Sequence, residues 1–315
     1  MILVAGSANL DFVVRAHHIP GPGETVLGRA FKTFPGGKGA NQAVACARAG
    51  GAVTRFLAAV GADAFADPIE ESLRQAQVSL SIVRSPSQPT GTAFICVSDD
   101  AENAITVAPG ANLCLGPEHL PDLAGVTHLL MQLEIPLATV TAYSQAARQQ
   151  AVTVVLNAAP VQKLPAQLLE LIDILVVNEG ELASLSATSA SVAQSLARIA
   201  VPTIVVTLGA RGCCVRHQGQ FLLQHGFVVE PVDTTAAGDS FCGSLVAALS
   251  TGAEMPHALR RACAAGALAC TRLGAQTSIP DSAEVTEFLN RHPSVNPAAI
   301  SALQTYCGLP SATLY

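Results

Sequence analysis

The chain has 315 residues, of which 50% are hydrophobic and 13% are charged, so it can build one large α/β core or two smaller ones. Its formal net charge is −6 and no basic cluster occurs, which excludes nucleic acid as an expected partner. The apolar runs are too short to cross a bilayer, and residues 1–6 resemble a strand rather than a signal sequence, so we expect a cytoplasmic protein with no membrane partner.

The predicted elements of the first third of the chain alternate between strands and helices. They are, in chain order, a buried strand at 1–6, two short extended pieces within 12–34 around a Pro-Gly loop, a helix at 42–49, a strand at 56–60, a helix at 67–77, and a hairpin of 92–97 with 103–107. The stretches 12–34 and 91–108 interrupt the alternation. They predict a small lid that stands off the main sheet.

From residue 126 onward the alternation becomes regular. Strands are predicted at 128–131, 153–157, 174–177 and 204–208, and helices at 137–149, 167–171, 192–199 and 241–249. Such strands, apolar throughout, favour a mostly parallel sheet covered by helices on both faces, with the ligand at the carboxyl edge of the sheet. The tail from residue 294 is predicted either as a short extra helix at 297–306 or as a loose extension.

Cysteine and histidine usage argues against structural metal sites and disulfides. The nine cysteines form an odd number and include no Cys-x-x-Cys pair, so we expect reduced, mostly buried thiols. The eight histidines show no His-Glu-x-x-His pattern, and no structural transition-metal site is predicted.

The most informative segment runs from Pro231 to Ser244. It places Asp239 directly after Ala236, Ala237 and Gly238, at the point where a helix is predicted to begin. Free backbone N–H groups and the helix dipole there form an anion site, which small side chains leave open. A carboxylate beside it is suited to accept a proton from a hydroxyl that attacks a phosphoryl group. The alternative is an acidic N-terminal cap on an ordinary helix.

A second glycine-rich segment, Gly36-Gly37-Lys38-Gly39-Ala40-Asn41, also precedes a helix. It lacks the spacing of a P-loop. Asn41 can hydrogen-bond to hydroxyls, and Lys38 can neutralise phosphate charge. The alternative is a glycine-rich turn with a solvated lysine.

Further polar residues follow predicted strands, and each has a purely structural alternative. Asn9 and Asp11 suit vicinal hydroxyls but also suit an Asx-type turn. Glu134 accepts from a hydroxyl or caps the helix after Pro136. Asn178 and Glu181 have the spacing of a capping box, and alternatively touch phosphate and order water around Mg²⁺. The loop at 207–212 lies along a nucleotide or forms a plain tight turn.

Taken together, these segments resemble the ribokinase-like (PfkB) carbohydrate kinase family. The motifs that carry the resemblance are Gly6-Ser7-Ala8-Asn9-Leu10-Asp11, Gly36-Gly37-Lys38-Gly39-Ala40-Asn41-Gln42-Ala43, Met131-Gln132-Leu133-Glu134, Asn178-Glu179-Gly180-Glu181, Thr207-Leu208-Gly209-Ala210-Arg211-Gly212 and Asp233-Thr234-Thr235-Ala236-Ala237-Gly238-Asp239. The motifs occur in the family's order and with its approximate spacing, and the resemblance covers residues 3 to about 292. The resemblance implies a three-layer α/β/α fold with a central, mostly parallel sheet and a small β-lid, in a kinase domain of residues 1–292 followed by an extension of residues 293–315.

The resemblance also implies an activity and a set of roles. The activity is transfer of the γ-phosphoryl group of ATP to the 5-hydroxyl of D-ribose, with Asp239 as base and Ala236, Ala237 and Gly238 as anion hole. The residues implied to hold the sugar are Asn9, Leu10, Asp11, Gly37, Lys38, Gly39, Ala40, Asn41, Glu134 and Asp239. Those implied to contact ATP are Asn178, Thr207, Leu208, Gly209, Ala210, Arg211, Gly212, Gly238 and Cys263.

Two cations and a second subunit are implied as well. Glu181 would support Mg²⁺ through water, and a K⁺ site would map to Asp233, Thr235, Ala269, Arg272, Gly274 and Ser278. The β-lid at 12–34 and 91–108 would pair two subunits into a homodimer. Cys263 stands where some members have a histidine near the adenine, and residues beyond 291 have no counterpart in the family.

The sequence leaves rival functions open. A kinase of the same fold could act on deoxyribose, a nucleoside or another sugar, because Asp11 and Asn41 favour vicinal hydroxyls without choosing among sugars. A non-catalytic sugar or nucleotide sensor is disfavoured, because such a protein has no need for Asp239, Lys38 and Glu181 together.

Overall fold

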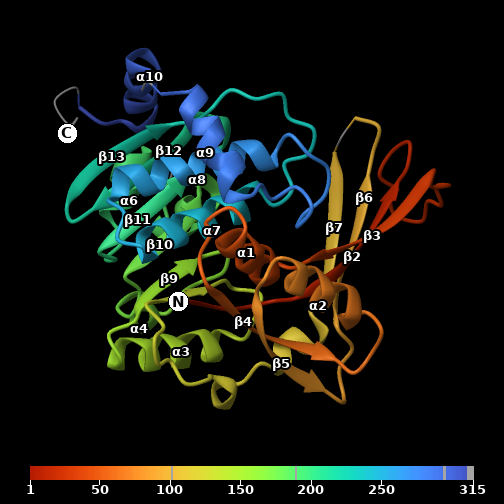
Figure 1. Ribbon diagram of the computed structural model, residues 1–315. Coiled ribbons are helices and arrows are strands. Elements are labelled where there is room, and N and C mark those ends of the chain that lie inside the picture. Colours follow the sequence, from red (N-terminus) through yellow and green to blue (C-terminus); the bar gives the residue numbers. More distant parts are fainter. Residues whose placement is uncertain (101, 189, 294–295, 311–315) are drawn as a thin grey trace.

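The computed structural model describes residues 1–100, 102–188, 190–293 and 296–310 and has two sheets of unequal size (Figure 1). The larger sheet has nine strands, in the spatial order β13 (Gln220–His225), β12 (Gly212–His217), β11 (Thr203–Thr207), β10 (Ile174–Asn178), β9 (Thr153–Asn157), β8 (His128–Met131), β1 (Ile2–Ala5), β4 (Thr54–Gly61) and β5 (Ser79–Ser85). Its strands pair in parallel except at the edge formed by β12 and β13. The predicted mostly parallel sheet is confirmed.

Helices cover both faces of this sheet and enclose two hydrophobic cores. One core lies under α1 (Lys38–Ala47), α2 (Ala66–Gln75), α7 (Ala237–Ser250), α8 (Met255–Ala269) and α9 (Ser282–Arg291). The other lies under α3 (Leu137–Gln149), α4 (Ala166–Leu169), α5 (Glu179–Ser186), α6 (Val192–Ala197) and α10 (Pro297–Cys307). Alternate residues of β1 belong to opposite cores, as a strand buried on both faces requires. The three-layer α/β/α architecture is therefore confirmed.

The smaller sheet is the lid. Its four strands are, in spatial order, β3 (Ala30–Gly36), β2 (Asn9–Arg15), β6 (Gly91–Val97) and β7 (Asn103–Ala108), and it stands beside the main body in Figure 1. The turn predicted between the last two strands includes residue 101, which lies outside the described residues. The 3₁₀ segments η1 (Gly110–Cys114) and η2 (Pro117–His119) lead from the lid back to β8.

Two differences from the sequence predictions affect the site, and one pair of alternatives, for the tail, is decided in favour of the predicted helix at 297–306. Asn9 and Asp11 lie within the lid strand β2 rather than in a turn. Helix α1 begins at Lys38 rather than at residue 42, so the predicted lysine and asparagine are helical. The tail forms the helix α10, which packs on β13 and α6, so the loose-extension alternative is wrong for the residues described there. Residues 294–295 and 311–315 of the expected extension lie outside the described residues.

No helix within the described ranges is both long and apolar enough to cross a membrane.

Candidate active site

The N-terminus of α7 has the form of an open anion site. Its N-cap residue Ala236 adopts a left-handed conformation with φ of 58°, and no side chain caps the helix. Helix geometry leaves the first N–H groups without intrahelical acceptors. A Cβ atom added to Gly238 would meet no atom within 4 Å, so the space in front of this turn is free for a ligand. Backbone donors and the helix dipole thus converge on an accessible position.

Asp239 does not cap this helix, so the capping alternative is wrong. Its carboxylate is bound instead by two side chains of α1. Asn41 Nδ2 donates to Oδ2 at 3.0 Å, and Gln42 Nε2 donates to Oδ1 at 2.9 Å. These two donors fix the carboxylate at the mouth of the anion site, where it can receive a proton from a hydroxyl.

Close approach of backbone explains the glycines at the start of α1. Gly37 has φ of +89°, and a Cβ there would lie 2.8 Å from the Asn9 nitrogen. A Cβ on Gly39 would lie 2.5 Å from the Ser7 nitrogen. Only glycine permits both contacts, which join the first turn of α1 to the segment before β2.

Lys38 is partly buried, and the charges of three carboxylates act on its ammonium group. Burial lowers its pKa, but the charges of Asp239, Glu134 and Glu181 outweigh burial and leave the pKa raised above its usual value. The ammonium group is therefore fully charged at neutral pH. The carboxylates that act on it are the predicted base, a predicted sugar ligand and the predicted magnesium-shell residue, which favours a site role over a solvated lysine.

Asn9 and Asp11 point to one side of β2, and each has a defined environment. Asn9 Oδ1 accepts a hydrogen bond from Asn112 Nδ2 at 2.7 Å, while Asn112 Oδ1 accepts from the Ala8 nitrogen at 2.9 Å. Asp11 is 8% exposed. Burial, followed by the charges of Glu134 and Asp239, raises the pKa of Asp11 from 3.8 to about 7. A buried carboxylate with this pKa lacks the donors that sugar hydroxyls would supply.

Glu134 does not cap α3, whose N-cap is Pro136 without a side-chain bond. Its Oε2 accepts from Ser7 Oγ and, at 3.1 Å, from the Lys38 nitrogen. It therefore lies where the first turn of α1, the end of β1 and the end of β8 meet. The second carboxylate oxygen remains available to a ligand.

Several buried polar atoms of the described residues near this site lack a partner, and one of them, Asn41 Oδ1, belongs to a predicted sugar-binding residue. Asn41 is 6% exposed, and its Oδ1 accepts no hydrogen bond from any described residue. Because an unpaired buried acceptor costs free energy, a ligand hydroxyl that donates to it would be favoured.

The two predicted nucleotide segments follow neighbouring strands β10 and β11. Asn178 and Glu181 form the predicted capping box, with both reciprocal bonds at 2.8 Å. Burial raises the pKa of Glu181, although the Asn178 N–H group and Lys38 act in the opposite direction. The segment Thr207–Gly212 contains the 3₁₀ turn η3 (Gly209–Arg211) and is closed by Leu208 N–H donating to the Gly212 carbonyl at 2.8 Å. Gly209 has φ of +58° and open space before it.

The segments predicted for K⁺ are also brought together. Asp233 Oδ1 accepts from the Thr235 N–H and hydroxyl groups, at 2.9 and 2.6 Å, and Oδ2 accepts from the Gly274 nitrogen at 2.9 Å. Both carboxylate oxygens thus organise backbone. Arg272 directs its side chain to Glu284, and Ser278 Oγ donates to the Ala275 carbonyl at 2.8 Å. Any cation here would rely mainly on carbonyl oxygens of these loops.

Three predicted site residues have side chains that pack elsewhere. Leu10 and Ala40 belong to the hydrophobic core beneath α1 and α7, so only their backbone can reach a ligand. Cys263 Sγ lies 3.8 Å from Cys213 Sγ in the same core. The side-chain positions of Leu10 and Cys263 give their predicted contacts no support.

A buried amide network behind Asp239 was not predicted. Gln42 Nε2, besides donating to Asp239, donates to Asn157 Oδ1 at 3.0 Å, and Gln132 Nε2 donates to Gln42 Oε1 at 2.6 Å. Gln42 and Gln132 are completely buried. Buried amides are usually hydrogen-bonded, so two glutamines within apolar motifs were the available signal for this network, in which Gln132 Oε1 has no partner among the described residues.

Comparison with known proteins agrees with this geometry. A sequence model of the pfkB family carbohydrate kinases matches residues 1–282. The chain belongs to the pfkB family of carbohydrate kinases. The protein named ribokinase from Haemophilus influenzae is 39% identical over 300 residues, which cover 91% of this chain and 98% of that protein.

Solved structures of ribokinases are similar to this chain over nearly its whole length. The crystal structure of the Thermotoga maritima ribokinase has a TM-score of 0.85 and 36% identity, and covers 92% of this chain and 99% of its own. The Arabidopsis thaliana ribokinase in complex with ribose and ATP also has a TM-score of 0.85, with 33% identity, and covers 91% of this chain and 98% of its own. The chain is thus a carbohydrate kinase with the ribokinase-like fold.

Proposed function

We propose that the protein phosphorylates the 5-hydroxyl of D-ribose with ATP, and that Asp239 is the catalytic base. The observation that carries the proposal is the placement of the Asp239 carboxylate, held by Asn41 and Gln42 beside the uncapped N-terminus of α7. The similarity to several proteins named ribokinase, one of them solved with ribose and ATP, supports ribose as the sugar.

In the proposed complex the sugar lies between the lid and α1. Its hydroxyls donate to Asp11, to Glu134 and to the unpaired Asn41 Oδ1, and the 5-hydroxyl faces Asp239. These contacts lower the pKa of Asp11 by giving its ionised form the donors that the free protein lacks. Lid closure excludes water, which would otherwise compete as phosphoryl acceptor.

ATP would lie along Asn178 and the Thr207–Gly212 segment, with its γ-phosphate at the N-terminus of α7. The 5-oxygen attacks the γ-phosphorus while its proton passes to Asp239, and the bond to the β,γ-bridging oxygen breaks so that ADP leaves. The amides near Gly238 and the ammonium of Lys38 stabilise the charge of the phosphoryl group during transfer. The products are ribose 5-phosphate and ADP.

Two cations complete the proposal. Glu181 is buried and has one carboxylate oxygen outside its capping box, so it fits a water-mediated Mg²⁺ contact that would neutralise phosphate charge. The loops joined by Asp233 fit a K⁺ held by carbonyls, which would set the shape of the adjoining anion site. Asp233 lies in the segment that leads directly into Ala236.

The choice of sugar is tested by comparing acceptors. Values of kcat/KM for ribose, 2-deoxyribose, fructose and ribonucleosides should favour ribose by about tenfold or more. For 2-deoxyribose and ribonucleosides, the lost hydroxyl leaves a buried acceptor unpaired. An equal or larger value for a nucleoside or fructose would assign the site to that substrate instead. Absence of ADP release with every acceptor would favour a sensor.

Gln42 is expected to act on catalysis through Asp239. Gln42→Leu removes one of the two donors that orient the base, so kcat should fall about 10-fold or more while KM for ribose changes little. In an Asp239→Asn background the same change should have no further effect, because the group that Gln42 orients is already lost. Gln75→Leu, on the exposed side of α2, is the matched control. Additive losses in the double variant would show that Gln42 is only structural.

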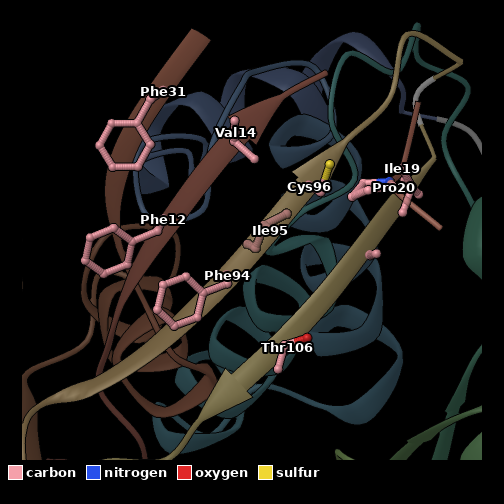
Figure 2. A pocket seen from close by; sticks show the side chains of 10 residues that line it. Phe12, Val14, Ile19, Pro20, Phe31, Phe94, Ile95, Cys96 and Thr106 are labelled. Carbon is pink, nitrogen blue, oxygen red and sulfur yellow. The ribbon is translucent and has the colours of Figure 1, made fainter. Parts of the chain in front are cut away.

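We further propose that the lid pairs two copies of the chain. Register places Phe12 beside Phe94, and Phe31 beside Val14, on the lid face opposite Asp11. The ring of Phe12 stacks with those of Phe31 and Phe94 at centroid distances of 6.1 and 5.4 Å. Phe31 is 63% exposed and Phe94 53% exposed, and they line an apolar hollow in Figure 2. Such a face favours a partner of equal chemistry.

The double variant Phe31→Ser with Phe94→Ser should therefore shift a dimer to monomer. Sedimentation of the wild-type chain should give about twice its 32.2 kDa mass at micromolar concentration, and that of the variant the single mass. Val53→Ser removes an even more exposed apolar side chain outside the lid and should leave the mass unchanged. A wild-type protein that sediments as monomer at all tested concentrations would contradict pairing.

The free state of all nine cysteines supports action in a reducing compartment such as the cytoplasm.

A further inference from the structure

The helix α10 lies beyond the last residue that the family model matches, residue 282, yet it is firmly attached to the fold. Leu303 and Cys307 belong to the core beneath α3–α6, and Asn296 both caps the helix and donates its backbone N–H to His225 Nε2 at 3.2 Å. In Figure 1 the helix lies over the β12–β13 end of the sheet. A helix placed in this way can present a side chain to a neighbouring loop at low entropic cost.

One side chain of α10 reaches both predicted nucleotide segments. The guanidinium carbon of Arg211 lies 4.0 Å from the centre of the Tyr306 ring. Arg211 Nη2 donates to Tyr306 Oη at 2.9 Å and to Glu179 Oε2 at 3.1 Å, and Tyr306 Oη donates to the other oxygen of Glu179. Stacking and hydrogen bonds thus join a cation, an anion and a phenol in one cluster.

The members of this cluster come from three separate places in the chain. Glu179 follows Asn178 at the end of β10, and Arg211 ends the turn η3 after β11. The Arg211 backbone is held by a hydrogen bond, because its carbonyl accepts from the Gly226 nitrogen at 2.9 Å. Tyr306 therefore links Glu179 and Arg211, and through them the two segments that are proposed to hold ATP.

We propose that Tyr306 of α10 is a positioning residue of the nucleotide site, which holds Arg211 and the Thr207–Gly212 segment in the conformation that binds ATP. The inference rests on the proposed nucleotide role of that segment. Without the tyrosine, Arg211 loses its stacking surface and one acceptor, and the exposed ion pair to Glu179 alone restrains it weakly. The segment must then be ordered by ATP itself, which weakens binding.

The test compares variants at position 306 in the full-length chain. Tyr306→Ala should raise KM for ATP and the Kd for ADP, measured by calorimetry, about 5-fold, because the stacking and hydrogen bonds of one cation are lost. KM for ribose and kcat should stay within about twofold. Tyr306→Phe keeps the ring and should lie between the wild type and Tyr306→Ala. Ser301→Ala, at another exposed position of α10, should leave all four values unchanged.

A double-mutant cycle separates positioning from a general effect on folding. Arg211→Ala alone should weaken nucleotide binding at least as much as Tyr306→Ala, and the two together should be no worse than Arg211→Ala alone. Additive losses, or equal rises in KM for ribose and ATP, would overturn the inference.

A third change distinguishes failure of the inference from failure of the proposed nucleotide site. Gly209→Val forces a side chain into a position with φ of +58° and should raise KM for ATP. If it does so while Tyr306→Ala has no effect, the nucleotide site stands and only the role of α10 is wrong. If Gly209→Val also leaves nucleotide binding unchanged, the segment does not hold ATP and both proposals fail.

Discussion

Asp239→Asn is expected to lower kcat by about 10² or more while KM for ribose stays within a few-fold. The amide cannot accept the proton of the attacking hydroxyl. Its NH₂ group would also face Asn41 Nδ2 or Gln42 Nε2, which now donate to the carboxylate oxygens, so the side chain must turn away from its present position. Steady-state kinetics with saturating ATP measure both parameters.

The matched control is Asp67→Asn. Asp67 is an exposed acidic residue in the first turn of α2, as Asp239 is in the first turn of α7, but it is not among the site residues. It should leave kcat unchanged. Near-normal turnover of Asp239→Asn would remove Asp239 from the role of base, and a collapse of sugar binding without loss of kcat would make it a binding residue.

Asp11→Asn should weaken ribose binding and, above neutral pH, stabilise the folded protein. Loss of the charged acceptor for sugar hydroxyls should raise KM for ribose about 10- to 100-fold, since hydrogen bonds to charged groups contribute about 1.5–3 kcal/mol. The wild-type enzyme should itself bind ribose less tightly as pH falls below about 7, because Asp11 takes up a proton there. The variant should lack this pH dependence.

The stability effect has a definite sign. The pKa of Asp11 is raised by folding, so its contribution to stability is fully present below the unfolded value of 3.8 and is lost as pH rises through about 7. At pH 8 the buried carboxylate therefore opposes folding, and asparagine does not. The gain in stability from Asp11→Asn should grow by about 2–3 kcal/mol between pH 5 and pH 8, since one pKa unit corresponds to about 1.36 kcal/mol.

Thermal unfolding at the two pH values measures this gain, with Asp122→Asn as an exposed control. A Tm difference between variant and wild type that does not change from pH 5 to pH 8 would mean that Asp11 is ionised at both, and that its surroundings do not oppose its charge.

The sequence was most informative where local pattern decides structure. The strands β8, β9 and β10 were predicted nearly to the residue, because they are buried on both faces and read as continuous apolar runs between polar ends. The hairpin of β12 and β13 was missed. Both strands mix polar with apolar residues, and their pairing across the edge of a parallel sheet has no local signature.

The start of α1 shows how tertiary contact overrides propensity. The helix was predicted to begin at residue 42, after the glycine-rich segment, and the glycine and asparagine within residues 38–41 disfavour helix. In the structure Gly39 packs against the backbone of Gly6 and Ser7, and the helix extends to Lys38 because that contact fixes its first turn. The contact joins residues more than thirty positions apart, which no window of sequence reveals.

The same limit applies to the site. Motif residues such as Asp239, Asn41 and Glu134 could be named individually, since each follows a glycine-rich or strand-end pattern. The bond from Gln42 to Asp239 spans 197 positions and depends on how α1 and α7 pack. Leu10 was assigned to the sugar with its neighbours, but the two-residue period of a strand turns it to the opposite face.

A sugar alcohol is proposed to attack ATP at the position marked by Asp239. Incubation of the protein with ribose, ATP and Mg²⁺, with products followed by ³¹P NMR, tests this step directly. We expect ribose 5-phosphate and ADP in equal amounts, with little inorganic phosphate released when ribose is omitted. Formation of ADP and inorganic phosphate at the same rate with and without ribose, or of a sugar phosphate at another hydroxyl, would contradict this proposal.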